Sequence, residues 1–554
     1  MIDGSSEVPS RKYLVSSSPQ YCLYMETINI LPMQPEIQNA WKKTCSIIFG
    51  EEIGQIEDYE EWLKGMIDPP QLMKSHISGK EVAVGIREYA PDSKFIGMEE
   101  IDYGKKFEKL DINEIKDIDS LVEALSDRFD YCGNIVLGNS INVERSTNIS
   151  DCSYAYDVAQ FRDSKFLAHC TVGRVCSHIF GVYGPGDSEF CIRCTQTYQD
   201  RRCFELWMSQ NCSDCYYIYN LDGCSNCIFS FNLRNKRNCI GNLEIDREKY
   251  ASIRNKLVGE IREELKKNKK LPSLIDIVES GKFVPPPKIK INEKQDATDV
   301  APIEREFSKT TEILFGKKLA KMEDYSDWLY THAHRITEIK SAVSGKTIRT
   351  NMYVIFQKGL PDKRVVDVEE ALELGRILKM AEKDVESLSL KNASERISKL
   401  AYFNAEFNEG KNDNMVECTL SIDCSNCYRA SATVRSKFCG CGMWPTSCEN
   451  CFGFDSIFFS NFSMNCYHSV KLMRCFEMDN CRDCADSMFC HNCEGLSNCM
   501  FCFNVKSKRY AIGNVEVSRD EYARIKKIVM DEIGKKLEKD NKIEWSIYNI
   551  GSRK

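Results

Sequence analysis

The sequence lacks a membrane-spanning segment and the signatures of familiar catalytic sites. No apolar segment approaches the roughly 18 residues typical of a transmembrane helix, and the N-terminus has no basic region followed by an apolar run, as a secretory signal would have. The chain also has no Walker-type phosphate loop, His-Glu-x-x-His or Gly-x-Ser-x-Gly sequence. These absences predict a cytoplasmic protein that is not an enzyme and has neither a membrane contact nor a small-molecule substrate.

Excess positive charge is also lacking. The formal net charge is -7, which argues against a protein whose main work is to coat nucleic acid, because that work needs a strongly basic face. Cysteine, in contrast, is abundant, with 29 residues. In a reducing cytosol such cysteines indicate metal ligands or buried thiols rather than disulfides.

The chain is internally duplicated. Residues 46–63 resemble residues 312–329, and both segments contain Glu-Asp-Tyr followed shortly by Trp-Leu. Residues 240–250 resemble residues 512–522 in the same way. A sequence that repeats at both ends of each half predicts two halves with one shared architecture.

Composition divides each half into three parts, and the predicted fold class is α+β. Each half is expected to contain an α/β head, a parallel β-solenoid of nine-residue Cys repeats and a capping amphipathic helix. The predicted boundaries are an N-terminal tail (1–24), a first head (25–130), a first Cys-rich β-solenoid (131–245), a cap helix (246–279), a proline-containing linker (280–304), a second head (305–412), a second Cys-rich β-solenoid (413–517), and a cap helix and tail (518–554).

The cap helices are the clearest local prediction. Ser518 and Glu521 form a capping-box pattern at the start of the second one. Apolar residues then recur at helical spacing in both segments. These residues are Tyr250, Ile253, Leu257, Ile261 and Leu265 in the first half, and Tyr522, Ile525, Ile528, Val529 and Ile533 in the second. We expect each helix to cover the open end of its β-solenoid, where a bare strand edge would otherwise be exposed.

Cysteines in the middle segments recur at multiples of nine residues. Nine residues suit one short strand and one turn, so two units would make an 18-residue rung. Cysteines 18 residues apart, such as Cys448, Cys466, Cys484 and Cys502, would then stack in one column. Asparagine often precedes cysteine, as at residues 211, 226, 426, 465 and 492, and its tolerance of a left-handed backbone suits a turn.

Residues 224–250 carry a resemblance to a known type of sequence. Their Cys-x-x-Cys pair runs into Asn-Leu-Arg-Asn-Lys, then Cys-Ile, and then Asp-Arg-Glu-Lys-Tyr. This pattern resembles a family of cysteine-rich, β-solenoid-like CxxC-repeat proteins that end in an Asn-Leu-Arg-Asn-Lys-x-Tyr-Cys-Ile segment and a helix. Asn238 stands where that family has tyrosine, and the match is weaker over residues 499–522. The resemblance implies the fold and assigns no catalytic residue.

The ladder cysteines have three interpretations. They are small apolar side chains that fill a thin interior, or zinc ligands in Cys-x-x-Cys half-sites, or ligands of an iron–sulfur or redox centre. For zinc, the first set of candidates pairs Cys481 and Cys484 with Cys499 and Cys502, and the same series includes Cys490 and Cys493. A zinc-ribbon-like set is Cys212, Cys215, Cys224 and Cys227, and a third set is Cys424, Cys427, Cys448 and Cys451.

The sequence as a whole favours a non-enzymatic, zinc-stabilised scaffold that binds another macromolecule, a protein or a ribonucleoprotein, through its two modules. One alternative is an RNA- or ribosome-binding factor, and another is an iron–sulfur, redox or cluster-assembly protein. The RNA alternative depends on basic clusters placed alike before each cap helix. These clusters are Arg234, Lys236 and Arg237 in the first half, and Lys506, Lys508 and Arg509 in the second.

Overall fold

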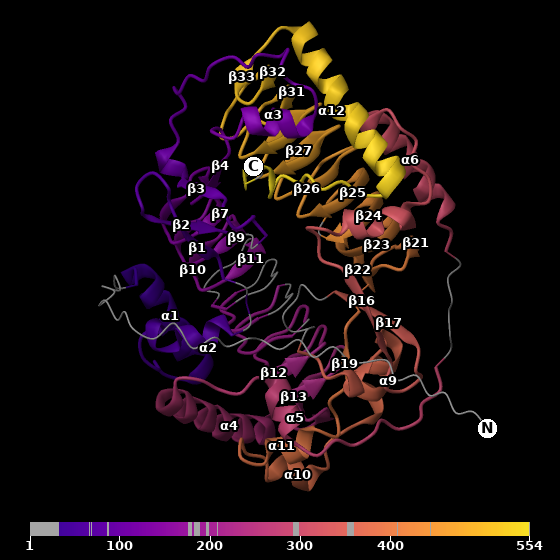
Figure 1. Ribbon diagram of the computed structural model, residues 1–554. Helices are drawn as coiled ribbons and strands as arrows, with labels where there is room; N and C mark the ends of the chain where they lie inside the picture. The colour runs from indigo at the N-terminus through magenta and orange to yellow at the C-terminus, as the bar shows by residue number, and fades with distance from the viewer. Residues whose placement is uncertain are drawn as a thin grey trace, which may run out of the picture.

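The computed structural model describes residues 33–552, apart from 66, 68, 86–87, 175–179, 182–188, 195–198, 208, 292–297, 352–358, 407 and 444. The predicted N-terminal tail, residues 1–24, lies outside them. The fold is mixed α/β, with many short parallel strands and with helices packed beside them (Figure 1). Within the described residues, no helix is long and apolar enough to cross a membrane.

Most strands belong to two coiled segments, which we call the first coil (residues 136–244) and the second coil (residues 408–516). The first coil contains β5 (Val136–Leu137), β6 (Ile141–Glu144), β7 (Thr147–Ser150), β8 (Ser153–Tyr156), β9 (Ala159–Arg162), β10 (Lys165–Ala168), β11 (Thr171–Arg174), β12 (Tyr216–Tyr219), β13 (Ser225–Phe231), β14 (Arg237–Ile240) and β15 (Leu243–Glu244). The second contains β20 (Asn408–Glu409), β21 (Asp413–Val416), β22 (Thr419–Ile422), β23 (Ser425–Val434), β24 (Lys437–Met443), β25 (Glu449–Asp455), β26 (Met464–Tyr467), β27 (Val470–Met473), β28 (Phe476–Asp479), β29 (Arg482–Ala485), β30 (Met488–His491), β31 (Ser497–Met500), β32 (Arg509–Ile512) and β33 (Val515–Glu516).

Each turn of a coil takes twelve residues. In the first coil, β8 pairs in parallel with β10 so that Ser153 lies beside Lys165. In the second, Cys427 lies beside Cys439, and Cys439 beside Cys451. The predicted parallel strands are therefore present, but the predicted 18-residue rung is wrong, and cysteines 18 apart do not stack.

A three-residue backbone pattern explains the twelve-residue turn. Every third residue has a positive φ over long stretches, for example from Asn465 to Asn492, and the buried interior side chain usually follows it directly. Four such three-residue sides make one turn. Asparagine tolerates this left-handed conformation, which explains the frequent Asn-Cys pairs. The nine-residue spacing was misleading because nine, like twelve, is a multiple of three.

The two heads contain different sets of helices and strands, but each precedes the coil of its own half in the chain. The first head contains α1 (Pro35–Phe49), η1 (Ile56–Tyr59), α2 (Glu60–Lys64), β1 (Gln71–Lys74), β2 (Glu81–Val84), β3 (Lys94–Gly97), η2 (Met98–Glu100), α3 (Ile118–Ala124) and β4 (Asp130–Gly133). The second contains α6 (Ala301–Phe315), η3 (Met322–Tyr325), α7 (Ser326–Leu329), β16 (Ile336–Lys340), β17 (Thr347–Asn351), η4 (Asp362–Arg364), β18 (Val365–Val366), α9 (Val368–Ile377), α10 (Glu382–Glu386), α11 (Ala393–Ile397) and β19 (Phe403–Asn404). Between the halves lies α5 (Leu274–Ser280), and η5 (Ile550–Ser552) ends the described chain.

Each head covers the end of the other half's coil. Arg128, after α3, donates a hydrogen bond of 2.7 Å from Nη1 to the carbonyl of Gly513 at the end of the second coil. Reciprocally, the backbone N–H of Met380 donates to the carbonyl of Gly241, the equivalent residue of the first coil, at 2.8 Å. The two halves thus close on one another as one body (Figure 1).

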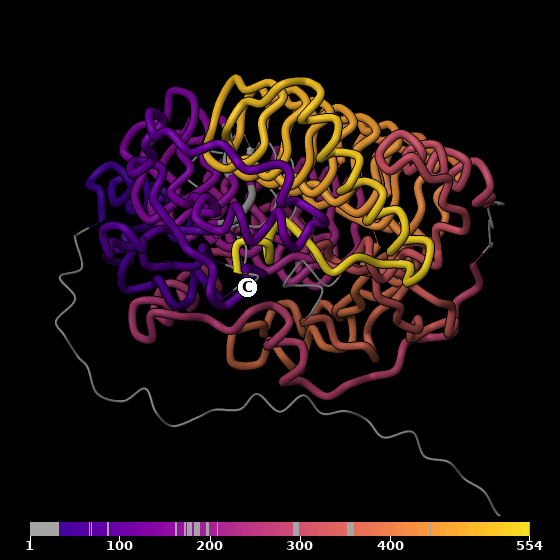
Figure 2. The backbone as a smooth tube through the Cα atoms, turned by 45° about the horizontal axis from the view of Figure 1, so that its top comes forward, coloured from indigo at the N-terminus to yellow at the C-terminus, as the bar shows by residue number. Residues whose placement is uncertain are grey.

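The predicted cap helices are present, but they cover flanks rather than ends. Helices α4 (Arg247–Asn268) and α12 (Arg519–Asp540) begin at the side-chain caps Asp246 and Ser518. Their predicted apolar stripes are buried, except that Ile528 is partly exposed. Helix α12 lies along the side of the second coil (Figure 2). A helix of 22 residues is about 33 Å long, which matches the side of a stack of about seven strands rather than its narrow end.

Candidate functional site

The interior of both coils is lined with sulfur. Of the 27 described cysteines, 26 are buried and all are free thiols. Two of the five hydrophobic clusters consist mainly of cysteines and other inward-pointing coil residues. A side of only three residues leaves room for small side chains, so packing accounts for part of this preference. The positions of individual thiols then show which of them could bind a metal ion and which only fill space.

Cys212, Cys215, Cys224 and Cys227 form a square arrangement that we call the four-thiol ring. The first two occupy neighbouring corners of one turn of the first coil, and the other two occupy the same corners one turn later. Side-chain interactions that shift their pKa values join Cys212 to Cys215 and Cys224, and they join Cys227 to the same two residues and to Cys239. Each thiol of the square therefore interacts with the two at its neighbouring corners.

The four-thiol ring favours loss of protons at two opposite corners. Hydrogen bonds with Cys212 and then Cys227 lower the pKa of Cys224. Burial raises the pKa of Cys215, but hydrogen bonds with Cys212 and Cys227 outweigh it, so that this pKa is also lowered. The hydrogen bonds with Cys215 and Cys224 raise the pKa of Cys212 in turn. Since the thiolate is the metal-binding form, this pattern suits a metal ion.

The other predicted cysteine sets do not form such a square. Cys481 and Cys484 are one and a half turns from Cys499 and Cys502, so the two pairs do not face each other. Instead, each pair joins a different neighbour, with Cys481 bonded to Cys484 and Cys493, and Cys502 bonded to Cys490 and Cys499. In the third set, Cys424 and Cys427 lie two turns from Cys448 and Cys451. Cys439 lies between the pairs, with its Sγ 3.3 Å from Cys427 Sγ.

The four-thiol ring must change shape to hold a tetrahedral zinc ion. Zinc–sulfur bonds of about 2.3 Å hold four sulfurs about 3.8 Å apart in a tetrahedron. Among the described residues, only Glu60, Asp157 and His169 place three ligand atoms all within 4.8 Å of one another. The diagonals of the four-thiol ring are therefore too long, and rotation of cysteine side chains would have to fold the square. The donors fit zinc in type and number.

The duplicated half provides an internal control for packing. The second coil has Cys484, Ser487, Leu496 and Cys499 at the places of the four ring cysteines, as the alignment of Gly241 with Gly513 shows. All four positions are buried or nearly buried in that coil as well. The same backbone turn thus closes around serine and leucine, so packing does not require the full set of four thiols.

A buried carboxyl group adjoins the four-thiol ring. Asp200 occupies the inward position one turn before Cys212, accepts a hydrogen bond from its backbone N–H, and accepts another of 3.2 Å from the hydroxyl of Ser209. Burial raises the pKa of Asp200 to about 8, so this carboxyl group is neutral at pH 7. A cavity of about 470 Å³, lined by Asp200, Cys212 and Glu189 among others, opens beside it.

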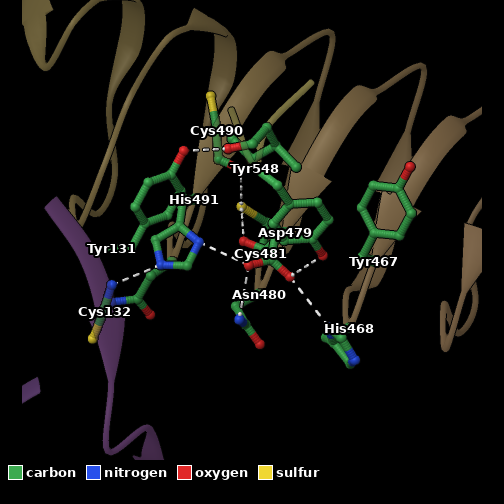
Figure 3. Close-up of polar contacts among 12 residues, drawn as sticks. Tyr131, Cys132, Tyr467, His468, Asp479, Asn480, Cys481, Cys490, His491 and Tyr548 are labelled. Carbon is green, nitrogen blue, oxygen red and sulfur yellow. Dashed lines mark hydrogen bonds and ion pairs between the residues drawn. The ribbon is translucent and has the colours of Figure 1, made fainter. Parts of the chain in front are cut away.

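A second polar cluster lies where the first head meets the second coil (Figure 3). At its centre is Asp479, which is fully buried. Its Oδ1 accepts hydrogen bonds from His468 Nδ1 at 3.2 Å and from the hydroxyl of Tyr548 at 3.1 Å. Its Oδ2 accepts from His491 Nδ1 at 2.8 Å and from Asn480 Nδ2 at 3.1 Å. One carboxylate therefore joins three turns of the coil to the C-terminal segment.

The two histidines differ in their hydrogen-bond partners. The backbone N–H of Cys132 in β4 donates to His491 Nε2 at 2.8 Å. His491 must accordingly carry its single proton on Nδ1 and is neutral. Burial lowers the pKa of His468, but its hydrogen bond to Asp479 outweighs this effect and raises the pKa. In Asp479, burial raises the pKa, and the hydrogen bonds with both histidines more than offset that rise, so that it is lowered.

Three cysteines also contact this cluster. Cys481 Sγ donates to the carbonyl of Asp479 and Cys493 Sγ to that of His491, both at 3.3 Å. Cys132, whose backbone N–H reaches His491, has its thiol on the carbonyl of Gly133 at 3.3 Å. Burial holds the pKa of Cys132 far above its ordinary value, so its thiol is not a nucleophile at neutral pH. The arrangement instead holds β4, the coil and Tyr548 together.

The group of Glu60, Asp157 and His169 is also filled by the protein itself. The Lys64 ammonium group makes ion pairs with both Glu60 and Asp157, and His169 Nδ1 lies 3.3 Å from Asp157 Oδ2. A cation from the protein thus already lies between the two carboxylates. We therefore interpret this group as an internal ion-pair network.

Three of the six side chains in the basic clusters are engaged within the molecule. Arg234 donates to the carbonyl of Asn220 at 2.7 Å, Lys236 pairs with Glu244 at 3.1 Å, and Lys506 pairs with Glu494 at 3.1 Å. Arg237 and Arg509 are exposed, and Lys508 is partly exposed. The two clusters therefore present less free positive charge than the sequence suggests.

Sequence reasoning did not identify Asp200 or the cluster around Asp479. Asp479 and His491 are twelve residues apart, as are Asp157 and His169. This spacing is a signal only once the length of the turn is known. Comparisons of the chain with protein-family models, with curated proteins and with solved structures found no match.

Proposed function

We propose that this protein is a non-enzymatic repeat scaffold stabilised by a zinc ion at the four-thiol ring. The observation that supports this proposal most directly is the set of thiol interactions among Cys212, Cys215, Cys224 and Cys227. Four buried thiolates are the usual ligands of a structural zinc, which contributes directly to folding. Of the three predicted sets, it is the zinc-ribbon-like one that the geometry favours.

An iron–sulfur centre fits the same residues less well. A four-iron cluster holds four cysteine ligands apart around its own iron and sulfide atoms. In the four-thiol ring the thiols at neighbouring corners instead interact with one another directly. A single ion is therefore the better match to the space between them.

The way the halves are joined supports the scaffold role. Their reciprocal contacts, through Gly241 and Gly513, fix the two coils relative to each other. A protein or ribonucleoprotein partner that touched both coils would gain the advantage of a second, effectively intramolecular contact. Because Arg234, Lys236 and Lys506 are already engaged, we favour a protein partner over RNA, and predict binding with a weak dependence on salt concentration.

Elemental analysis tests the zinc proposal, with a variant copied from the duplicated half. Cys215→Ser and Cys224→Leu together give the first coil the residues that occupy the same places in the second coil, Ser487 and Leu496. We expect about one zinc fewer per chain than in the unmodified protein, with similar circular dichroism. The matched control, Cys466→Ser, removes a buried coil thiol whose hydrogen bonds go to backbone groups. Equal zinc content in the ring variant and the unmodified protein would refute the site.

A further inference from the structure

The second coil contains another square of four sulfur-containing side chains, at a different place from the four-thiol ring. Met478 and Cys481 occupy neighbouring inward corners of one turn, and Cys490 and Cys493 occupy the same corners of the next. The register pairs Met478 with Cys490 directly, and Cys481 is hydrogen-bonded to Cys493. All four side chains are at most 2% exposed and belong to one buried cluster.

Packing alone does not require sulfur at these positions. The equivalent corners of the first coil are Leu206, Ser209, Ile218 and Leu221, and they are buried to the same degree. The two halves therefore build the same turn from four sulfur-containing residues in one case and from none in the other. The difference indicates a chemical role that only the second coil has.

The thioether distinguishes this square from the four-thiol ring. Zinc in proteins takes cysteine, histidine and carboxylate ligands, and iron–sulfur clusters are held by cysteine thiolates. Methionine together with cysteine is instead the soft donor set that selects monovalent copper. The burial of all four side chains also limits the access of water, a ligand that divalent ions prefer.

We propose that Met478, Cys481, Cys490 and Cys493 form a binding site for one copper(I) ion. The ion replaces protons on the thiol groups, which leave to solvent, and no electron is transferred because copper enters and stays in the monovalent state. The site lies in the second coil and does not depend on the zinc proposed for the first coil.

An anaerobic competition titration of the full chain tests the site. Copper(I) is supplied as its complex with the chromophoric chelator bicinchoninate, and its transfer to the protein is followed by loss of the chelator's colour. The main variant is Met478→Leu, which keeps the volume of the side chain. Its control is Met464→Leu, a buried methionine that packs in the core under the helices rather than inside the coil.

We expect Met478→Leu to bind one copper(I) equivalent roughly 10–100-fold more weakly. Loss of a residue that only orients a metal ligand already lowers metal affinity by about this factor. Met464→Leu is expected to match the unmodified protein. A second variant copies the first coil, with Met478→Leu, Cys481→Ser, Cys490→Ile and Cys493→Leu, and is expected to bind one equivalent fewer.

Unchanged affinity in Met478→Leu would overturn the thioether's role, and the same would follow from an equal loss in Met464→Leu. If the fourfold variant does not fold, as judged by circular dichroism, the two methionine variants decide the question. Equally tight zinc binding at the second coil, measured by the same competition with a zinc chelator, would also contradict the proposal. Zinc content at the four-thiol ring is measured separately, so the two sites can fail independently.

Discussion

Replacing Asp479 by alanine is predicted to loosen the contact between the first head and the second coil. The substitution removes one charge-bearing partner from a fully buried group. It leaves His468, His491 and the hydroxyl of Tyr548 without their acceptor. Removal of one partner of a buried ion pair costs about 3–5 kcal/mol. We expect a loss of that size in the free energy that holds these segments in place.

Hydrogen exchange measured by mass spectrometry locates the effect. Peptides that cover residues 130–133 and 544–551 should exchange faster in Asp479→Ala, because both segments are tied to this carboxylate through His491 and Tyr548. The matched control is Glu494→Ala, which breaks a surface pair with Lys506 and should cost no more than about 1 kcal/mol. Unchanged exchange in both segments of Asp479→Ala would refute the view that the cluster joins the halves.

Three further predictions concern the coil backbone, pH and metal. Gly410 has a φ of +68°, and an added Cβ would lie 2.1 Å from Asp423 Oδ1, whereas Gly345 has a φ of +73° and open space around it. We therefore expect Gly410→Ala to lower the melting temperature clearly more than Gly345→Ala does. For pH, the raised pKa of His468 means that its contribution to stability is present below the ordinary histidine pKa of 6.5 and is lost as pH rises through the raised folded value. The lowered pKa of Asp479 means that its contribution is lost as pH falls below 3.8 toward its folded value. Denaturant midpoints should decline on both sides, and Asp479→Asn should flatten both declines, so an unaltered profile would contradict the assignment. A zinc chelator should lower the melting temperature of the unmodified protein and should not lower that of Cys215→Ser, Cys224→Leu, and an equal shift in both would place the metal elsewhere.

Much of the secondary structure could be predicted from short patterns. The capping box at Ser518 and the apolar stripe behind it identified α12 because helix signals lie within a few residues of one another. The recurrent Asn-Cys pairs likewise pointed to left-handed positions, and Asn426 and Asn492 have φ values of 52° and 50°. These features depend on local backbone preferences, which the sequence expresses directly.

The stacking of the turns could not be deduced from the cysteine spacing. Distances of three, nine, twelve and eighteen residues all preserve a three-residue pattern, so Cys484 and Cys502 resemble a stacked pair although they lie on different sides of the coil. Only the pairing of strands, as between Cys427 and Cys439, sets the turn at twelve. For the same reason, the sequence did not reveal the contact between Asp479 and His491. It also favoured another candidate zinc set over the zinc-ribbon-like cysteines.

The contact of each head with the coil of the other half could also not be predicted from the sequence. Gly513 is covered by Leu125 and Arg128, nearly four hundred residues earlier in the chain. Helix α12 showed an apolar face, but the sequence did not specify what covers that face. Such long-range partners are decided by shape and by the packing of whole elements, which local patterns do not record.

X-ray absorption at the zinc edge of the purified, zinc-loaded protein tests the central claim most directly. A zinc ion at the four-thiol ring should show four sulfur neighbours at about 2.3 Å, and this signal should disappear in the variant that carries Cys215→Ser and Cys224→Leu. Nitrogen or oxygen neighbours in the unmodified protein, or four sulfurs that persist in the variant, would contradict the assignment of Cys212, Cys215, Cys224 and Cys227 as the site.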